Sequence, residues 1–201
     1  MTDVLPPTPE GIRRAAALLA AGEVVAFPTD TVYGVGVAAS RPDRLDALFE
    51  LKDRPIDRRI PMLVASLDQA SSAGGRPDDR ARTLADRFWP GALTLVLSSA
   101  GGPTQAFRAP DHPVALALMR EAGPIFATSA NVSDEPDTMG ADEVLVAFAT
   151  RQDGLAAVID GGRAPGGRAS TVLDLAVSPA RILRPGPIGP EQIREVVELG
   201  S

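Results

Sequence analysis

Blocks of helical and strand periodicity alternate along the chain. Ala15, Ala16 and Leu19 recur at the spacing of one helix face, and they follow Thr8 and Pro9, which favour the start of a helix. Elsewhere, short apolar runs lie between turn residues, a pattern typical of buried strands. The 19 glycines and 19 prolines are concentrated in the joints between these blocks.

This reasoning predicts six helices and nine strands. The helices are expected over about 8–21, 40–52, 78–88, 113–121, 141–149 and 190–198, and the strands over about 24–27, 32–38, 61–65, 93–97, 105–108, 125–128, 157–160, 170–175 and 181–183. The order is mixed, without repeats and without a long linker. It predicts an α+β fold, a mixed twisted β-sheet flanked by helices.

Composition narrows the class of protein. A chain of 201 residues with 44% hydrophobic and 23% charged residues fits one globular domain. No apolar run approaches the roughly 20 residues of a membrane span, and the N-terminus does not resemble a secretory signal, so we expect a cytoplasmic protein without a membrane partner. The absence of cysteine and the single histidine, His112, exclude a disulfide framework and leave little material for a metal site.

The charge balance argues against broad binding to nucleic acid. The formal net charge is −6, whereas such binding needs a basic face. Of the 20 basic residues, Lys52 is the single lysine and the rest are arginines, a preference that a GC-rich codon bias would also produce. The net charge does not exclude a small basic pocket.

The segment PTDTVYG, residues 28–34, follows a predicted buried strand. Polar groups at such a strand end commonly line a site. The alternative is a turn in which Asp30 and Thr31 satisfy local backbone groups while Tyr33 packs at a rim. The segment alone favours neither interpretation.

A cationic segment, KDRPIDRR, covers residues 52–59. Lys52 and Arg54 are two residues apart, a spacing that aims both at one anion if the backbone is extended. The alternative is a solvated charge run at a helix end. Lys52 is expected in an exposed loop, so its replacement should cost activity and little stability.

Two further segments, one polar and one rich in glycine, are candidates for contacts with a ligand. TSAN, residues 128–131, follows an apolar strand and provides hydroxyl and amide groups, or else an Asx or Ser/Thr turn. DGGRAPGGRASTVLD, residues 160–174, allows close backbone approach to a phosphate, or else forms a surface loop. Arg108 and Arg184 each end an apolar strand, and His112 is expected to be structural rather than a catalytic base.

Taken in order, these segments resemble one family. PTDTVYG, KDRP, WPGALTLVL, FRAPDHP, ATSANVSDEP, DGG followed by STV, and ILRPG are similar to the YrdC-like threonylcarbamoyl-adenylate synthase family, over about residues 12–195. The resemblance implies a mixed sheet around a concave basic cavity. It also implies the short type, a single YrdC-like domain over 1–201 without a second C-terminal domain.

The resemblance further implies an enzyme, a nucleotidyltransferase. It would combine L-threonine, bicarbonate and ATP into L-threonylcarbamoyladenylate, with release of pyrophosphate, for the threonylcarbamoyladenosine (t6A) modification of tRNA. Mg²⁺ is expected with ATP, held mainly by phosphate oxygens and waters. Separate threonylcarbamoyl-transferase proteins acting on tRNA are the expected downstream partners. The alternatives are an RNA-binding or ribosome-maturation module and a paralogue without synthase activity.

The family's site residues transfer onto matching positions of this chain. The resemblance implies a catalytic role for Lys52 and Arg54, threonine contacts from Tyr33, Arg108, Ser129 and Ser170, ATP contacts from Lys52, Arg54, Arg58, Thr104, Asn131 and Arg184, and no protein metal ligand. Four positions depart from the family's usual residues, namely Arg59, Asp134, Met139 and Ala169.

Overall fold

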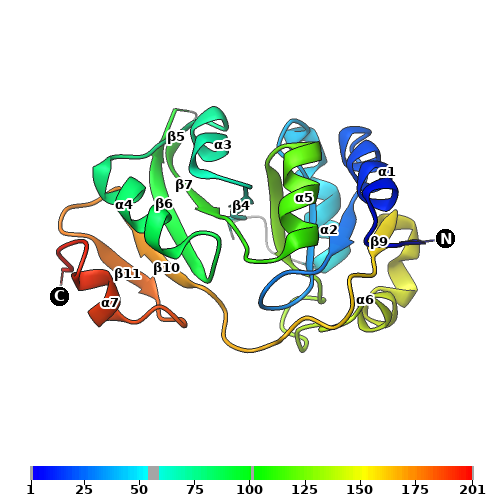
Figure 1. The fold of residues 1–201 in the computed structure, drawn as a ribbon. Coiled ribbons are helices and arrows are strands. Elements are labelled where there is room, and N and C mark those ends of the chain that lie inside the picture. The colour runs from blue at the N-terminus through cyan, green and yellow to red at the C-terminus, as the bar shows by residue number, and fades with distance from the viewer. Residues whose placement is uncertain (1, 54–58, 101, 201) are drawn as a thin grey trace.

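The computed structural model describes residues 2–53, 59–100 and 102–200 (Figure 1). Its α-helices are α1 (Pro9–Ala20), α2 (Leu45–Lys52), α3 (Leu67–Ser72), α4 (Asp79–Phe88), α5 (Pro113–Ala122), α6 (Ala141–Ala147) and α7 (Pro190–Arg194), and its 3₁₀ helices are η1 (Pro42–Arg44) and η2 (Ala149–Gly154). Its strands are β1 (Asp3–Leu5), β2 (Val25–Phe27), β3 (Gly34–Ala38), β4 (Met62–Leu63), β5 (Gly75–Arg76), β6 (Leu93–Ser99), β7 (Gly102–Arg108), β8 (Ile125–Ser129), β9 (Ala157–Ile159), β10 (Thr171–Asp174) and β11 (Arg181–Arg184).

Side-chain caps begin several helices where the sequence pattern places them. The Thr8 hydroxyl accepts a hydrogen bond from the Gly11 amide at 3.3 Å, and the Asp78 carboxylate accepts one from the Ala81 amide at 2.9 Å. Each cap satisfies an amide that the first helical turn leaves without a partner. The predicted starts of α1 and α4 are therefore confirmed.

The short elements β1, α3, β5 and η2 were not predicted. β1 has only three residues and pairs in parallel with β9, more than 150 positions along the chain, so no local pattern marks it. For α3 a signal exists, because the Ser66 hydroxyl accepts from the Gln69 amide at 3.2 Å in an S-x-x-Q pattern.

The last helix is shorter than predicted. α7 ends at Arg194, four residues before the expected end at 198. The chain then turns back toward the sheet, where the Ala180 amide donates to the Glu198 carbonyl at 3.0 Å. The Val197 amide still donates to the Ile193 carbonyl at 2.9 Å, and the pairing with Ala180 begins at the next residue.

The strands form one mixed sheet. Within the described residues it has eleven strands in the order β1-β9-β2-β3-β8-β4-β7-β6-β10-β11, with β5 pairing β6 off this path. The sheet contains parallel pairs, such as β4 with β7 and β10 with β6, and antiparallel pairs, such as β3 with β8 and β6 with β7. The predicted mixed sheet with flanking helices is confirmed.

One half of the sheet is covered on both faces. In β2, Val25 and Phe27 belong to a buried cluster with α1 and α5, while Ala26, and Val24 just before the strand, belong to a second cluster with α2 and α6. This explains why these strands are continuously apolar, as strands buried on both faces are. Figure 1 shows α1 and α5 side by side in this half, and α1 and α5 make many contacts.

The other half of the sheet is covered on one face. Leu93, Leu95 and Leu97 of β6 are buried with the residues that face them from α3, α4 and α7. Thr94 and Val96 alternate with them and therefore point to the opposite face. That face carries the pocket described below. The segment between β9 and β10 runs across the lower edge of the molecule in Figure 1 and joins the two halves.

No helix in the described part of the chain combines the length and apolar character needed to cross a membrane.

The close approach of β3 to β8 generates a stability prediction. A Cβ added at Gly36 would lie 2.3 Å from the Phe126 carbonyl oxygen and 2.8 Å from an Ile125 side-chain atom. Because a backbone atom cannot give way easily, we expect Gly36→Ala to lower the free energy of unfolding by about 1–3 kcal/mol, the usual cost of overpacking. Urea unfolding measures this value.

Gly102→Ala is the matched control, because a Cβ there meets no atom within 4 Å. Equal stability of both variants would contradict the tight packing between β3 and β8.

Candidate functional site

A pocket of about 680 Å³ lies on the uncovered face of the sheet. Its walls come from the loop after β2, from β6, β7 and β10, from the end of β8 and from Arg184 of β11. The volume is in the range of about 300–1,000 Å³ that is typical of small-molecule sites. The pocket therefore combines segments that lie far apart in sequence.

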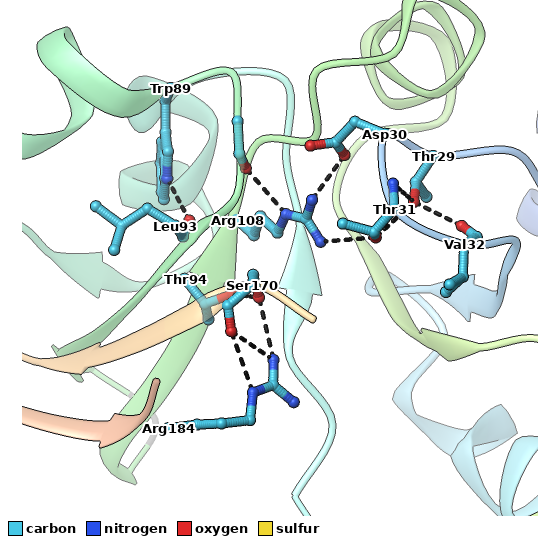
Figure 2. Close-up of polar contacts among 11 residues, drawn as sticks. Thr29, Asp30, Thr31, Val32, Trp89, Leu93, Thr94, Arg108, Ser170 and Arg184 are labelled. Atoms are coloured by element: carbon cyan, nitrogen blue, oxygen red, sulfur yellow. Dashed lines mark hydrogen bonds and ion pairs between the residues drawn. The ribbon is translucent and has the colours of Figure 1, made fainter. Parts of the chain in front are cut away.

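Arg108, at the end of β7, is held by two other segments of the chain, the turn at Gly91 and the loop after β2 (Figure 2). Its Nε donates to the Gly91 carbonyl at 3.0 Å, its Nη1 to Thr31 Oγ1 at 3.4 Å and its Nη2 to Asp30 Oδ1 at 2.6 Å. The side chains of Arg108 and Asp30 are 9% and 14% exposed, so the ion pair is nearly buried. Such a pair is costly to form unless hydrogen bonds compensate for the loss of water, and three hydrogen bonds hold the Arg108 guanidinium here.

Arg184 approaches the same pocket from β11. Its Nε and Nη2 donate to the Ser170 carbonyl at 3.1 and 2.9 Å, and Nη2 also donates to Ser170 Oγ at 3.1 Å. Ser170 Oγ lies 2.8 Å from Thr94 Oγ1. Figure 2 shows this group below Arg108. Partial burial lowers the pKa of Arg184, the positive charge of Arg108 lowers it further, and the negative charge of Asp137 raises it. The guanidinium remains charged near neutral pH because its ordinary pKa is so high.

Tyr33 is buried and lines the pocket, so the alternative that it packs at a rim is wrong. Its hydroxyl donates to the Gly162 carbonyl at 2.7 Å and accepts from the Gly161 amide at 3.3 Å. Burial raises the pKa of Tyr33, the Gly161 hydrogen bond opposes this, and the charge of Asp160 adds to it. The neutral phenol thus holds the glycine-rich segment 160–169 against the loop after β2.

Lys52 does not lie in an exposed loop, and that expectation is wrong. The residue ends α2, is 2% exposed, and its ammonium donates to the carbonyls of Ser129 and Asn131 and, at 3.4 Å, to Asn131 Oδ1. Lys52 lies on the buried face of α2, four positions after Leu48, and Asp53 in the αL conformation ends the helix directly after it. Lys52 therefore fastens the 129–131 turn to α2.

The structure brings most of the predicted site residues to one pocket. Those among the residues that line it are Tyr33, Thr104, Arg108, Ser129, Ser170 and Arg184. Lys52 and Asn131 contact each other but are not among the residues that line it. Arg54 and Arg58 lie outside the described residues.

Several pocket residues were not singled out from the sequence. Thr94, Asp137 and Asp174 line the pocket, and Asp30 holds Arg108 from behind. For Thr94 and Asp174 the signal is period-2 alternation. Thr94 lies between the buried Leu93 and Leu95 of β6, and Asp174, the last residue of β10, lies between the buried Leu173 and Leu175. The Asp30 contact with Arg108 spans 78 positions and has no local signal.

Each of the four departures from the family's residues has a structural setting. Arg59 lines the pocket and donates to Thr104 Oγ1 at 2.9 Å. Asp134 has a φ of 65°, a left-handed conformation that glycine adopts most easily, which explains the glycine expected there. The Met139 carbonyl accepts from the Ala164 amide at 2.7 Å and so anchors the glycine-rich segment. Ala169 lines the pocket.

The basic character of the cavity stays a prediction. The lining residues include Arg59, Arg108 and Arg184, and also the carboxylates of Asp137 and Asp174. Among the described residues, no three histidine or acidic side chains form a group that could hold a metal ion. A magnesium ion that arrives with a nucleotide is compatible with this donor set, because phosphate and water oxygens supply most of its ligands.

The fold and the site define a class of protein, a mixed α/β protein with a pocket of the size typical of small-molecule sites. A family model with the description Telomere recombination, Sua5/YciO/YrdC, matches residues 17–186. The chain belongs to the Sua5/YciO/YrdC family.

Three similar proteins carry informative names. The chain is 44% identical to a threonylcarbamoyl-AMP synthase of Bacillus subtilis, over 98% of this chain and 59% of the relative. It is 38% identical to a putative threonylcarbamoyl-AMP synthase of Mycobacterium tuberculosis, over 93% of this chain and 89% of the relative. The structure of Pyrococcus abyssi Sua5 with L-threonine matches with a TM-score of 0.89 and 35% identity, over 100% of this chain and 62% of that one.

The chain spans about three fifths of the length of the Bacillus subtilis and Pyrococcus abyssi relatives.

The buried position of Lys52 generates a stability prediction. Lys52→Met keeps most of the aliphatic volume but leaves the Ser129 and Asn131 carbonyls without this donor. We expect the free energy of unfolding to fall by about 1–3 kcal/mol, the usual cost of an unsatisfied buried polar group. Urea unfolding measures it. Glu50→Gln, an exposed change in the same helix, is the control and should stay within about 0.5 kcal/mol. A fully stable Lys52→Met would contradict the structural role.

His112 generates a pH prediction. It precedes α5, its Nδ1 is buried without a hydrogen-bond partner among the described residues, and burial lowers its pKa against the opposing charges of Asp30 and Asp111. As the pH falls below about 6.5, the unfolded chain binds a proton that folded His112 resists, so stability falls. We expect His112→Gln to lose less stability than the wild type between pH 7.5 and 5.5. Since His112 is the single histidine, equal losses would contradict the shift.

Proposed function

We propose that the protein is an L-threonylcarbamoyladenylate synthase, a nucleotidyltransferase that uses L-threonine, bicarbonate and ATP. The observation that carries the proposal is the convergence of Arg108, Arg184, Ser129, Ser170 and Tyr33 on one pocket. Support comes from the similarity to Pyrococcus abyssi Sua5, which was solved with L-threonine, and from relatives named threonylcarbamoyl-AMP synthase.

Threonine would occupy the end of the pocket near Arg108. An arginine offers paired N–H groups that match a carboxylate. Ser129 and Ser170 offer hydroxyl groups that donate and accept, and Tyr33, which also lines the pocket, would contact threonine.

ATP would occupy the end of the pocket near Arg184 and Thr104. Arg184 supplies positive charge from β11, and Thr104 lies on β7 beside Arg59. Arg54 and Arg58 would add charge on the phosphates from the segment that follows α2. Lys52 does not line the pocket. Its positive charge would act on the phosphates from behind the 129–131 turn, where its ammonium binds the Asn131 carbonyl.

The reaction needs two anions to meet. The threonine amine captures bicarbonate as a carbamate, with loss of water, and a carbamate oxygen then attacks the α-phosphorus of ATP. The new P–O bond forms as the bond to pyrophosphate breaks. Cations that reduce the repulsion and fix the approach supply most of what catalysis requires, so a dedicated general base is not needed. Mg²⁺ bound to the phosphates would neutralise charge on the leaving pyrophosphate.

The proposed product would pass to separate threonylcarbamoyl-transferase proteins that act on tRNA, and this role fits a cytoplasmic location.

A single YrdC-like domain over residues 1–201 remains our expectation.

The test is pyrophosphate release from ATP, with L-threonine and bicarbonate each omitted in turn. We expect release only with both present, together with formation of threonylcarbamoyl-AMP, measured by mass spectrometry. Arg184→Ala should raise the KM for ATP more than that for threonine. Exposed Arg13→Ala is the control.

Release that ignores threonine would refute the proposed reaction. Binding of RNA without any pyrophosphate release would favour an RNA-binding module, and a folded protein without either activity would favour a paralogue that has lost synthase activity.

A further inference from the structure

Asp30 lies behind the pocket wall. Arg108 and Thr31 line the pocket, whereas Asp30 is not among the lining residues. Its carboxylate reaches Arg108 from the side of the loop after β2, as Figure 2 shows. A ligand in the pocket would therefore meet Arg108 and Thr31, and Asp30 would act on it through Arg108.

The donors of Arg108 are only partly used by the protein. A guanidinium has five N–H groups, and contacts with Gly91, Thr31 and Asp30 occupy three of them among the described residues. Two N–H groups remain for a ligand. Three acceptors from two separate segments, the turn at Gly91 and the loop after β2, leave the guanidinium plane little freedom to rotate, so the direction of the remaining donors is set before a ligand binds.

The hydrogen bonds of the Thr29 and Thr31 hydroxyl groups determine which group donates and which accepts next to Arg108. Thr29 Oγ1 donates to the Val32 carbonyl at 2.6 Å, which uses its one proton. In the 3.1 Å contact between the two threonines, Thr31 must then be the donor. The Thr31 oxygen is left as an acceptor, and it faces Nη1 of Arg108. The loop after β2 therefore presents an acceptor, Thr31 Oγ1, to an N–H group of Arg108.

We propose that Asp30 is a positioning residue for recognition of the amino-acid carboxylate by Arg108. This inference rests on the proposed function, because it takes threonine as the ligand of Arg108. Asp30 accepts one N–H and fixes the orientation of the guanidinium, and the remaining N–H groups then meet the substrate carboxylate. The acceptor geometry of Asp30 matters more in this role than its negative charge, which by itself weakens the attraction of Arg108 for a second carboxylate.

The experiment compares Asp30→Asn with Asp30→Glu. Asparagine keeps an acceptor oxygen at the same distance from the backbone and loses the charge, whereas glutamate keeps the charge and moves the acceptor by one methylene. Dissociation constants for L-threonine are measured by calorimetry, and KM values for threonine and ATP by pyrophosphate release. Thermal unfolding reports whether each variant is folded.

We expect Asp30→Asn to bind threonine within about threefold of the wild type and Asp30→Glu to bind it about tenfold more weakly. The KM for ATP should stay within about twofold in both variants, which a general loss of structure would not allow. Asp43→Ala, which removes the exposed partner of Arg41, is the control and should change neither constant.

The reverse ranking, with asparagine weaker than glutamate, would overturn the inference, because charge would then matter more than geometry. Wild-type affinity in both variants, or equal weakening in both, would also overturn it. Absence of threonine binding in the wild type would refute the proposed function itself, and the inference with it.

Discussion

The uneven covering of the mixed sheet is the constraint on which the rest of the structure depends. Around β2, β3, β8 and β9, helices pack on both faces, and every position of β2 and β3 is buried. Around β6, β7 and β10, helices pack on one face. Because side chains alternate across a strand, one set of these residues must enter the core and the other must face the open side. The pocket lies on that open side.

Two cations, Arg108 and Lys52, are buried near the boundary between the two halves of the sheet. Arg108 is nearly buried at the end of β7 and Lys52 at the end of α2, and an uncompensated charge at either place would be costly. Each is satisfied by groups from distant segments, Arg108 by the loop after β2 and the turn at Gly91, Lys52 by the 129–131 turn. The need to pair these two cations therefore brings together segments that hydrophobic packing alone leaves unspecified.

The glycine-rich segment 160–169 has a structural part in the site. It crosses from β9, in the half covered on both faces, to β10, in the half covered on one face. Tyr33 and the Met139 carbonyl bind its backbone, and its end supplies Ala169 and Ser170 to the pocket wall. The two departures at Met139 and Ala169 thus fall where the segment is anchored and where it enters the pocket.

Local sequence patterns determined most of the elements and the class of fold. The caps at Thr8 and Asp78 and the alternation in β6 depend on neighbouring residues alone, so they were readable. The order of the segments also identified the family and six of the residues that line the pocket.

The tertiary structure decided what depends on contacts between distant residues. The sequence placed Lys52 at a helix end but not in the interior, since the carbonyls that bind it lie 77 and 79 positions away. It offered Asp30 as a local turn residue, whereas the partner of Asp30 is Arg108, 78 positions away. Local patterns report which side chains are polar. Which of them become buried, and against which partner, is set by the packing of the whole chain.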